Sequence, residues 1–295
     1  MHTNKHRGIL RYNEPMSRYT AWGVGGMAAF FFEPTDIDDL ADFLATFPEE
    51  KPIFWLGLGS NLLVRDGGIN GAIIRTFGLL NNLRESMLGV VRAEAGVTCA
   101  RFARFCAKCE LGGSEFLAGI PGTIGGALAM NAGAFGGETW TIVRQVETLD
   151  RKGVRRIRKP FDFEIGYRDV SGPEGEWFAA AEFILTQKDR EKIELKMQEL
   201  LQCRREEQPT GMQSCGSVFQ NPPGKYAGYL IDQCGLKGFR VGGAAISNKH
   251  ANFILNLDMA TAADIESLIN KVADIVEQET GIRLEPEVRI IGDRI

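Results

Sequence analysis

Residues 119–137 read GIPGTIGGALAMNAGAFGG, and this stretch says most about the fold. Glycine recurs along it, but Ile120, Ile124, Leu128 and Met130 lie between the glycines, so we expect it to pack inside the protein. A buried glycine-rich turn lets the backbone approach a ligand and direct N–H groups at it, and dinucleotide pyrophosphates are common occupants. The alternative is a set of tight turns in an all-β region.

A second glycine loop, Gly57-Leu-Gly-Ser-Asn61, follows the apolar run 53–56. Two such loops favour a ligand site over simple turns. The dinucleotide-binding fingerprint G-x-G-x-x-G would need glycine at position 62, where the chain has Leu62, and residues 61–66 show no helical pattern. The sequence therefore predicts that loop N–H groups, rather than a helix N-terminus, hold the phosphates.

Composition and charge exclude several classes of protein. The chain has 295 residues, 44% of them hydrophobic, which suits one or two compact domains, and its formal net charge is −4. The densest basic run, 151–159, alternates with apolar residues and predicts an exposed hairpin rather than a nucleic-acid surface. No stretch is long and apolar enough to span a bilayer, and residues 1–11 lack the apolar core of a secretory signal. We expect a cytoplasmic monomer with no nucleic-acid or membrane partner.

Cysteine and histidine content argues against metal and triad chemistry. Without an export signal, six cysteines do not indicate a disulfide framework. Cys106-Ala-Lys-Cys109 is a CxxC motif, but it lies in a helical pattern and is interpreted as helix packing. With three histidines in the chain, a histidine metal site or a Ser-His-Asp triad would depend almost entirely on His250. No metal is predicted.

Apolar periodicity predicts helices and strands in mixed order. Helices are expected after Thr35, after Thr98, over 188–207 and after the capping-box pattern Thr261-Ala-Ala-Asp264, and strands over 53–56, 72–75, 90–93, 142–149, 179–186 and 288–291. They do not alternate strictly as β-α-β, which favours an α+β fold over a doubly wound sheet. Pro209 ends the long charged helix, so a domain boundary is expected near residue 206.

Three further segments carry residues suited to chemistry. Arg168, within Gly166-Tyr-Arg-Asp169, could pair with a substrate carboxylate, although a surface turn is the simpler interpretation. Ser217 has no nearby base in the sequence, so a turn hydroxyl is its default role. Glu287 begins a hydrophobic strand, where burial would raise the pKa of its carboxyl, and an edge-strand salt bridge is the alternative.

Six motifs along nearly the whole chain occur in the order found in one enzyme family. They are Asn13-x-Pro15 with Trp22-x-Val-Gly-Gly26, then 58–63, 119–126 with Asn131-Ala-Gly133, Tyr167-Arg168, 216–222 and 285–289. Together they resemble the UDP-N-acetylenolpyruvoylglucosamine reductases. Segments 215–224 and 249–251 resemble the type II subgroup, which lacks the tyrosine-bearing loop that closes over the substrate in type I. One departure is Val170, where the family often has serine.

The resemblance implies an α+β fold with a two-part FAD-binding region of the vanillyl-alcohol-oxidase (PCMH) type and a C-terminal α+β substrate-binding domain. The parts would be residues 1–76, rejoined by a C-terminal strand at 289–295, then 77–205, then 206–288. It implies non-covalent FAD, with NADPH as co-substrate. The implied activity is UDP-N-acetylmuramate dehydrogenase, which reduces the enolpyruvyl group of UDP-N-acetylglucosamine-enolpyruvate to the lactyl ether for peptidoglycan synthesis.

The resemblance also implies roles for single residues. Arg168 would offset the charge of an enolate, Glu287 would act with it in protonated form, and Ser217 would protonate the carbanionic carbon. The cofactor would be held by Gly57, Gly59, Ser60, Asn61, Leu62, Gly119, Ile120, Pro121, Gly122, Thr123, Gly125, Gly126, Asn131 and Gly133. The substrate would meet Tyr167, Asn221, Lys225, Tyr226, Lys249 and His250, the last either by contact or by holding its loop.

Two rival interpretations are open. An oxidase with the same FAD cradle would often attach its flavin through histidine, but no histidine lies between His6 and His250, which excludes such attachment near the glycine loops. A non-catalytic nucleotide-binding module would give Ser217, Arg168 and Glu287 no reason to converge.

Overall fold

The computed structural model describes residues 6–295, and the chain forms two compact units. Unit 1 contains the described residues up to Arg11 with Phe30–Leu58 and Gly71–Cys203. Unit 2 contains Tyr12–Ala29, Gly59–Asn70 and Arg204–Ile295. The predicted boundary near residue 206 lies beside the last change of unit, whereas a boundary at 76/77 falls inside unit 1. The three-part division stays a prediction, and the expected polar start of the chain falls partly on residues 1–5, outside the described residues.

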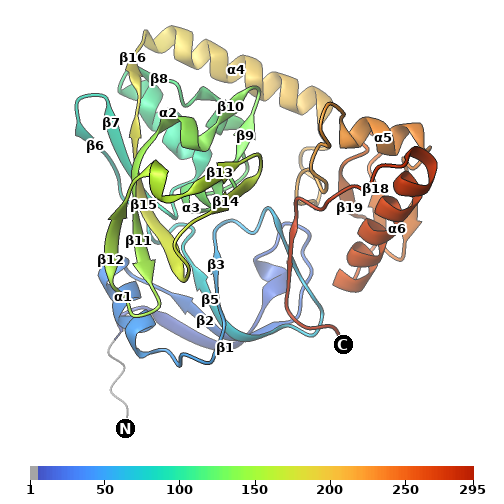
Figure 1. Ribbon diagram of the computed structural model, residues 1–295, viewed down its shortest axis with the longest axis horizontal. Coiled ribbons are helices and arrows are strands. Elements are labelled where there is room, and N and C mark those ends of the chain that lie inside the picture. Colours follow the sequence, from blue (N-terminus) through green and yellow to red (C-terminus); the bar gives the residue numbers. More distant parts are fainter. Residues whose placement is uncertain (1–5) are drawn as a thin grey trace. The chain divides into compact units, whose positions relative to one another are not determined.

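The helices and strands are interspersed along the sequence, as expected for an α+β chain (Figure 1). The α-helices are α1 Ile37–Thr46, α2 Cys99–Lys108, α3 Ile124–Ala129, α4 Arg190–Glu207, α5 Ala227–Gln233 and α6 Ala262–Thr280, and the 3-10 helices are η1 Met16–Arg18, η2 Glu115–Gly119, η3 Thr139–Ile142 and η4 Pro160–Asp162. The strands are β1 Ile9–Pro15, β2 Met27–Glu33, β3 Ile53–Leu56, β4 Leu62–Val64, β5 Ile69–Arg75, β6 Leu83–Met87, β7 Val90–Glu94, β8 Leu111–Gly112, β9 Gly133–Ala134, β10 Gly137–Glu138, β11 Val143–Asp150, β12 Arg155–Arg158, β13 Glu164–Gly166, β14 Asp169–Ser171, β15 Glu176–Ile184, β16 Thr186–Gln187, β17 Arg240–Val241, β18 Ala244–Ile246, β19 Ile254–Asn256 and β20 Arg289–Ile291. Each predicted helix and strand is present, with its ends shifted by a few residues.

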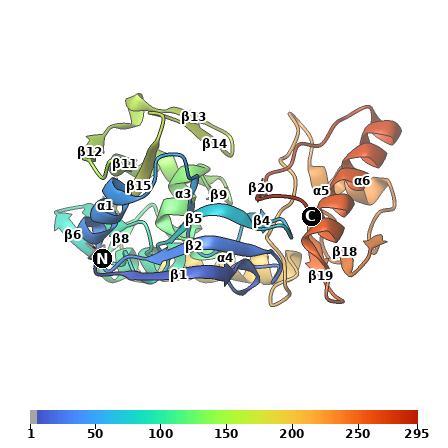
Figure 2. The same ribbon diagram turned by 90° about the horizontal axis from the view of Figure 1, so that it is seen from below.

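Helix α1 packs on a four-stranded sheet with the order β1-β2-β5-β3, in which β1, β2 and β5 lie side by side (Figure 2). Its apolar residues Leu40, Phe43 and Leu44 are buried against residues of the sheet such as Phe32, as their helical spacing predicts. The prediction that Thr35 caps this helix is wrong. Asp36 is the N-cap, because its carboxylate accepts the N–H of Asp39 at 2.8 Å.

The second layer of unit 1 is an antiparallel sheet with the order β12-β11-β15-β7-β6. Helix α2 begins after the predicted cap Thr98 and buries Phe102 and Cys106 in the core of this layer. Helix α3 packs against β15 and β7 (Figure 1). The basic run 151–159 forms the turn and second strand of the β11–β12 hairpin, which confirms that prediction.

The glycine-rich stretch 119–137 is buried in unit 1 only in part, since Ile120 and Met130 are half-buried and Phe135 is exposed, and its middle is helical. Ile124 and Leu128 are fully buried, and Thr123 caps α3 by accepting the N–H of Gly126. Sequence analysis did not predict this helix, because paired glycines have low helix propensity. Its presence makes the alternative of tight turns in an all-β region wrong.

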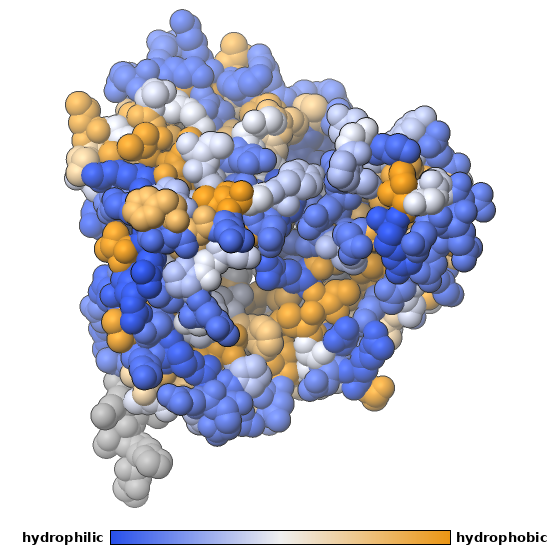
Figure 3. All heavy atoms as spheres, in the orientation of Figure 1, coloured by the Kyte–Doolittle hydropathy of each residue, from blue (hydrophilic) through white to orange (hydrophobic). Residues whose placement is uncertain are grey.

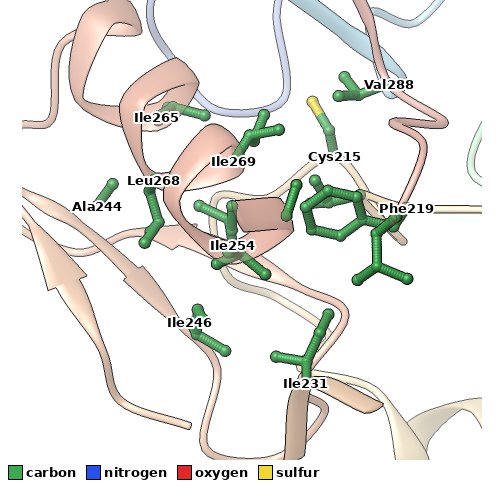
Figure 4. Close-up of a cluster of buried hydrophobic side chains, with 14 of the residues drawn as sticks. Cys215, Phe219, Ile231, Ala244, Ile246, Ile254, Ile265, Leu268, Ile269 and Val288 are labelled. Atoms are coloured by element: carbon green, nitrogen blue, oxygen red, sulfur yellow. The ribbon is translucent and has the colours of Figure 1, made fainter. Parts of the chain in front are cut away.

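Unit 2 has its core between α5, α6 and a three-stranded sheet with the order β17-β18-β19. Ile231, Ile246, Ile254 and Leu268 converge there, as Figure 4 shows. Helix α6 has the predicted capping box of Thr261 and Asp264, and Gly281 ends it at φ 72° in the left-handed region that glycine tolerates.

The C-terminal strand β20 pairs in parallel with β4, so that Arg289 lies opposite Leu62 and Ile291 opposite Val64. Residues 62–64 belong to the segment that the C-terminal strand was expected to rejoin. Strand β4 directly follows the first glycine loop, so the pairing fixes one end of that loop within unit 2. Residues 62–64 are extended, in agreement with the lack of a helical pattern after Gly59.

The face in Figure 3 is mostly hydrophilic, with hydrophobic patches among the polar residues. None of the helices between residues 6 and 295 combines the length and the apolar character that crossing a membrane requires.

Candidate active site

The two glycine loops meet inside unit 1 at Gly57 and Thr123. A Cβ built on Gly57 would collide with Oγ1 of Thr123 and would also crowd its Cβ and Cγ2, at 3.3 Å each. A residue other than glycine at this position would have to displace the Thr123 side chain, whose Oγ1 caps α3. The sequence analysis placed both residues at a cofactor, and the structure brings them together.

The first loop leaves several backbone donors unused. Among the backbone hydrogen bonds of residues 6–295, none has the N–H of Leu58, Gly59 or Ser60 as donor. Gly59 itself has φ 68° and no room for a side chain beside the carbonyl of Tyr19, so its conformation requires glycine. Consecutive N–H groups in such a turn form a site for an anion such as a phosphate.

The second loop uses most of its donors internally. Ile120 donates to the carbonyl of Leu117 at 3.1 Å, and Gly122 donates to that of Ile120 at 3.0 Å. Gly125 donates to the carbonyl of Ala95 at 2.9 Å. Within the described chain, the N–H of Thr123 makes no such bond. Residues 119–126 therefore mainly shape the cradle, and fewer of their N–H groups can reach a ligand than the sequence analysis assumed.

Asn131 is a buried hydrogen-bonding centre rather than an open ligand contact. It is 1% exposed and has φ 44°. Its Nδ2 donates to Glu138 and to the carbonyl of Gly166, each at 3.0 Å, and its Oδ1 accepts the N–H of Trp140 at 3.1 Å. These bonds occupy the carboxamide, and the N–H of Asn131 donates to the carbonyl of Leu128 at 3.4 Å, so the predicted cofactor contact of Asn131 has no support from these groups.

Tyr167 and Arg168 form the two-residue turn between β13 and β14, which pair through Gly166 and Asp169. Arg168 therefore lies in a turn, which was the simpler interpretation of the sequence, and this turn also carries the predicted substrate contact Tyr167. Arg168 has φ 57°, an unfavourable value for a residue with a long side chain. Its guanidinium donates to the carbonyls of Gly133 at 2.6 Å and Asn131 at 3.3 Å, and it lies 5.1 Å from the centre of the Tyr167 ring. The strained turn places this cation against the glycine-rich stretch.

Ser217 and Glu287 lie on neighbouring segments of unit 2. The N–H of Glu287 donates to the carbonyl of Val218 at 2.7 Å, and the N–H of Gln220 donates to that of Glu285 at 2.9 Å. Both side chains are partly exposed. Two of the three predicted catalytic residues are thus brought together by an antiparallel pairing between residues far apart in the sequence.

The end of the first glycine loop borders these segments, also within unit 2. Asn61 donates through Nδ2 to the carbonyl of Glu287 at 3.1 Å. The thiol of Cys215 is buried 3.6 Å from the carbonyl of Leu62 and 3.8 Å from that of Gly59. Residues predicted to hold a cofactor and residues predicted to catalyse are therefore neighbours here.

A cavity of about 320 Å³ opens beside Ser217. Five predicted site residues line it, namely Ser217, Asn221, Tyr226, Lys249 and His250. Lys225 is exposed and does not line it, which leaves its predicted substrate contact without support from this cavity. Asn221 has a structural task as well, since its Oδ1 accepts the N–H of Ala227 at the start of α5.

His250 and Lys249 are held by their own loop. Both backbone N–H groups donate to Oγ of Ser247, at 3.3 and 3.1 Å. Burial lowers the pKa of His250, which keeps its ring neutral near pH 7. Since Nδ1 accepts the N–H of Asn252 at 3.2 Å, the remaining proton belongs on Nε2 and can be donated. The Lys249 ammonium donates to the carbonyl of Arg205 at 2.6 Å.

Four further polar residues that were not predicted also line this cavity: Tyr229, Asp232, Lys237 and Asn252. A signal existed for two of them. Tyr226, Tyr229 and Asp232 recur every third residue, the spacing of one helix face, but 227–233 was not predicted to be a helix. Asn252 is 4% exposed, and an isolated buried asparagine leaves no pattern in a sequence.

The cysteines show no sign of redox or metal chemistry in the described part of the chain. All six are free thiols, and no group of three or more His, Cys, Asp or Glu side chains in residues 6–295 is arranged to hold a metal ion. Burial raises the pKa of the Cys106 thiol to about 12, as expected for helix packing rather than a reactive CxxC motif.

Comparison with known proteins identifies the family. A model described as "UDP-N-acetylenolpyruvoylglucosamine reductase, C-terminal domain" matches residues 208–291, and one described as "FAD binding domain" matches 28–157. The UDP-N-acetylenolpyruvoylglucosamine reductase of Alkalilimnicola ehrlichii is 55% identical over 97% of this chain and 96% of its own length. The chain belongs to the UDP-N-acetylenolpyruvoylglucosamine reductase family.

Further relatives agree. The reductase of Methylococcus capsulatus is 54% identical over 97% of this chain and 94% of its own length. The crystal structure of the reductase (MurB) from Thermus caldophilus is 35% identical, covers 96% of this chain and 98% of that one, and superposes with a TM-score of 0.83. These findings confirm the family and the α+β fold class that the sequence predicted.

The residues present in this reductase-family chain fit FAD. The crowded contact of Gly57 with Thr123 is a cradle that a Cβ would fill, and the N–H groups of Leu58, Gly59 and Ser60 are available for a pyrophosphate. The match of the FAD-binding model to 28–157 includes both glycine loops.

Proposed function

We propose that this protein is an NADPH-dependent flavoenzyme that reduces the enolpyruvyl ether of UDP-N-acetylglucosamine-enolpyruvate to the lactyl ether, giving UDP-N-acetylmuramate. The observation that carries the proposal is the cavity of unit 2, where the predicted proton donor Ser217 shares one lining with four predicted substrate-binding residues. A structural cavity would have no need to gather hydroxyl, amide, ammonium and imidazole groups.

FAD would be held without a covalent bond, through the open N–H groups of residues 58–60 and the loop shaped by Gly57 and Thr123. When bound, FAD would accept hydride from NADPH and pass it to the terminal vinyl carbon of the substrate. Backbone donors suit this task, because their positions do not change with the charge of the ligand.

Arg168 would stabilise the negative charge that develops on the substrate carboxylate and its neighbouring carbon. A guanidinium donates through several N–H groups in a fixed plane, which matches a carboxylate. The carbonyls of Gly133 and Asn131 orient this group before substrate arrives, so little reorganisation is needed during reaction.

Ser217 would give its hydroxyl proton to the carbanionic carbon and later recover a proton from solvent. A serine hydroxyl is a weak acid in water, but it serves here because an enolate is strongly basic and the geometry is fixed. Glu287 would assist as a protonated carboxyl. Its backbone pairing with Val218 supports placing it beside Ser217.

The nucleotide part of the substrate would lie in the cavity of unit 2. Asn221, Tyr226 and Lys249 offer donors for a diphosphate, and neutral His250 offers Nε2–H. Tyr167 of unit 1, half exposed beside Arg168, is a further proposed substrate contact.

We also place the enzyme in the cytoplasm as a monomer without a nucleic-acid partner. A UDP-linked substrate and NADPH are small molecules, and the net charge of −4 supports the absence of a polyanion-binding surface.

Purified protein tests the proposal. It should be yellow and release free FAD on denaturation, and it should consume more than one equivalent of NADPH per flavin only when the enolpyruvyl substrate is present. Colourless protein that takes up no FAD would favour a non-catalytic module. Consumption of oxygen with an alcohol substrate, without need for the UDP-sugar, would favour an oxidase.

A further inference from the structure

One buried residue, Asn252, holds the two residues that follow Ser217. Asn252 accepts the N–H of Phe219 through Oδ1 at 2.9 Å and donates through Nδ2 to the carbonyl of Phe219 at 2.8 Å. Its own carbonyl accepts the N–H of Val218 at 2.9 Å. A single residue therefore makes three hydrogen bonds to a two-residue segment, in the manner of a neighbouring strand.

The opposite side of the same segment is fixed by Glu287, whose N–H donates to the carbonyl of Val218 at 2.7 Å. Before Ser217 the side chain of Cys215 is buried, but within the described chain neither Cys215 nor Gly216 makes a backbone–backbone hydrogen bond. Gly216 has φ 73°, and a Cβ built on it would meet no atom of the described residues within 4 Å. The position of Ser217 thus depends mainly on the bonds made by the residues after it.

Asn252 also connects this segment to the cavity. It lines the cavity together with Ser217, and its N–H donates to Nδ1 of His250 at 3.2 Å. Asn252 therefore both holds Phe219 and orients the imidazole of His250.

We propose that Asn252 is a positioning residue for proton transfer: its carboxamide clamp on Phe219 sets the place of the Ser217 hydroxyl at the substrate carbon. The inference rests on the proposed function, in which Ser217 is the proton donor. A weak acid gains most from exact placement, and a displacement of about 1 Å can cost on the order of 100-fold in rate.

The carboxamide is specific for this task, because it offers one acceptor and one donor to the same peptide group. Asn252→Asp keeps the shape and the acceptor but sets an oxygen against the carbonyl of Phe219. Asn252→Ala removes both bonds. Asn252→Gln keeps the polar group and shifts it by one methylene, so it serves as the displaced variant even where the other two yield little holoenzyme.

The experiment separates the half-reactions by anaerobic stopped flow on holoenzyme. NADPH should reduce the flavin of each Asn252 variant within about twofold of the wild-type rate. Net reoxidation of the reduced flavin by the enolpyruvyl substrate, which is complete only when the carbanionic carbon has been protonated, should slow by roughly 10- to 100-fold. The substrate dissociation constant, from titration of the oxidised flavin spectrum, should change by less than about threefold, since a positioning role affects rate rather than affinity.

Asn256 supplies a matched control in the same unit. Its Nδ2 donates to the carbonyl of Trp22 at 2.9 Å, and its Oδ1 accepts the N–H of Ala260 at 2.9 Å, so Asn256→Ala loses the same kinds of bond. Within residues 6–295, none of the hydrogen bonds of Asn256 goes to Val218 or Phe219. Reoxidation in this variant should match the wild type.

A double variant tests whether Asn252 acts through Ser217. Adding Asn252→Ala to Ser217→Ala should slow reoxidation no further than Ser217→Ala alone. Multiplied losses in the double variant, or wild-type reoxidation in Asn252→Gln, would overturn the positioning role. Normal reoxidation in Ser217→Ala itself would instead overturn the proposed function, so the two failures are distinguishable.

Discussion

A Cβ on Gly57 would collide with Oγ1 of Thr123, although the two residues are 66 positions apart in the sequence. This contact makes one cradle out of two segments. Its consequence for the cofactor can be measured directly.

Gly57→Ala should push Thr123 away and loosen the flavin. We expect purified Gly57→Ala to retain less than half of the wild-type flavin, measured as the ratio of absorbance at the flavin and protein bands. Gly126→Ala, at an exposed predicted cofactor contact where a new Cβ meets Thr123 Oγ1 only at an ordinary 3.7 Å, measures direct crowding of the flavin without a collision between the loops. Within helix α3, that alanine should stabilise the fold by up to about 1 kcal/mol. Full flavin content in Gly57→Ala would show that the cradle does not hold FAD.

Arg168→Lys should lower kcat by about 100- to 1,000-fold, the usual cost of losing an oriented donor to a developing anion. A lysine carries a point charge and cannot reproduce the two bonds to the carbonyls of Gly133 and Asn131. Flavin reduction by NADPH should be unaffected. Arg144→Lys, which alters an ion pair with Glu182 in the same unit, is the control. A rise in KM with unchanged kcat would remove Arg168 from enolate stabilisation.

Ser217→Ala should still oxidise NADPH in a single turnover but fail to complete reduction of the substrate. Without the hydroxyl, the substrate carbanion has no positioned proton donor. Product formation, followed by chromatography of the UDP-sugar, should fall by at least about 100-fold. Normal turnover in this variant would contradict the assigned role.

Glu266 should make a pH-dependent contribution to the stability of unit 2. Hydrogen bonds from Arg65, at 2.9 and 3.0 Å, and from Arg294 lower the pKa of its carboxyl from 4.5 to about 2. A lowered pKa means that the folded state favours the carboxylate. The contribution is therefore complete above about pH 5, is lost as pH falls from 4.5 toward 2, and should amount to on the order of 1–2 kcal/mol after solvent screening.

Urea unfolding of wild type and Glu266→Gln at pH 7, 5 and 3.5 measures the contribution of Glu266 to the free energy of unfolding. The difference between the two should be constant from pH 7 to 5 and smaller at pH 3.5. Glu194→Gln removes an exposed pair with Arg190 and should differ from wild type by less than about 0.5 kcal/mol throughout. A difference that grows toward pH 3.5 would contradict the assignment.

Local signals explain which elements the sequence could predict. The caps of α2 and α6 are a threonine at the N-cap and a capping box, which act over three or four residues and can be read directly. Helix α3 could not be predicted, because packing of Ile124 and Leu128 outweighs the poor propensity of its glycines. Helix α5 is short, and its apolar residues Ala227, Leu230 and Ile231 were too few to reveal a period.

The candidate site likewise contains residues that the sequence could predict and contacts that it could not. Ser217, Arg168 and Glu287 could be named because a resemblance to a family carries residue types at fixed spacings. The pairing of Val218 with Glu287 and the clamp of Asn252 on Phe219 could not be predicted, since both join segments distant in sequence. Asn131 is the opposite case: its motif could be recognised, but its carboxamide makes hydrogen bonds to Glu138 and Trp140 inside the protein.

The pairing of β4 with β20 has a consequence for biosynthesis. Leu62 finds its strand partner in Arg289, and Asn61 accepts the N–H of Arg289 at 3.2 Å. A nascent chain on the ribosome lacks that partner until strand β20 has been synthesised. The first glycine loop can therefore become fixed at this end only after β20 has been synthesised, and we expect a product truncated before residue 289 to retain less flavin.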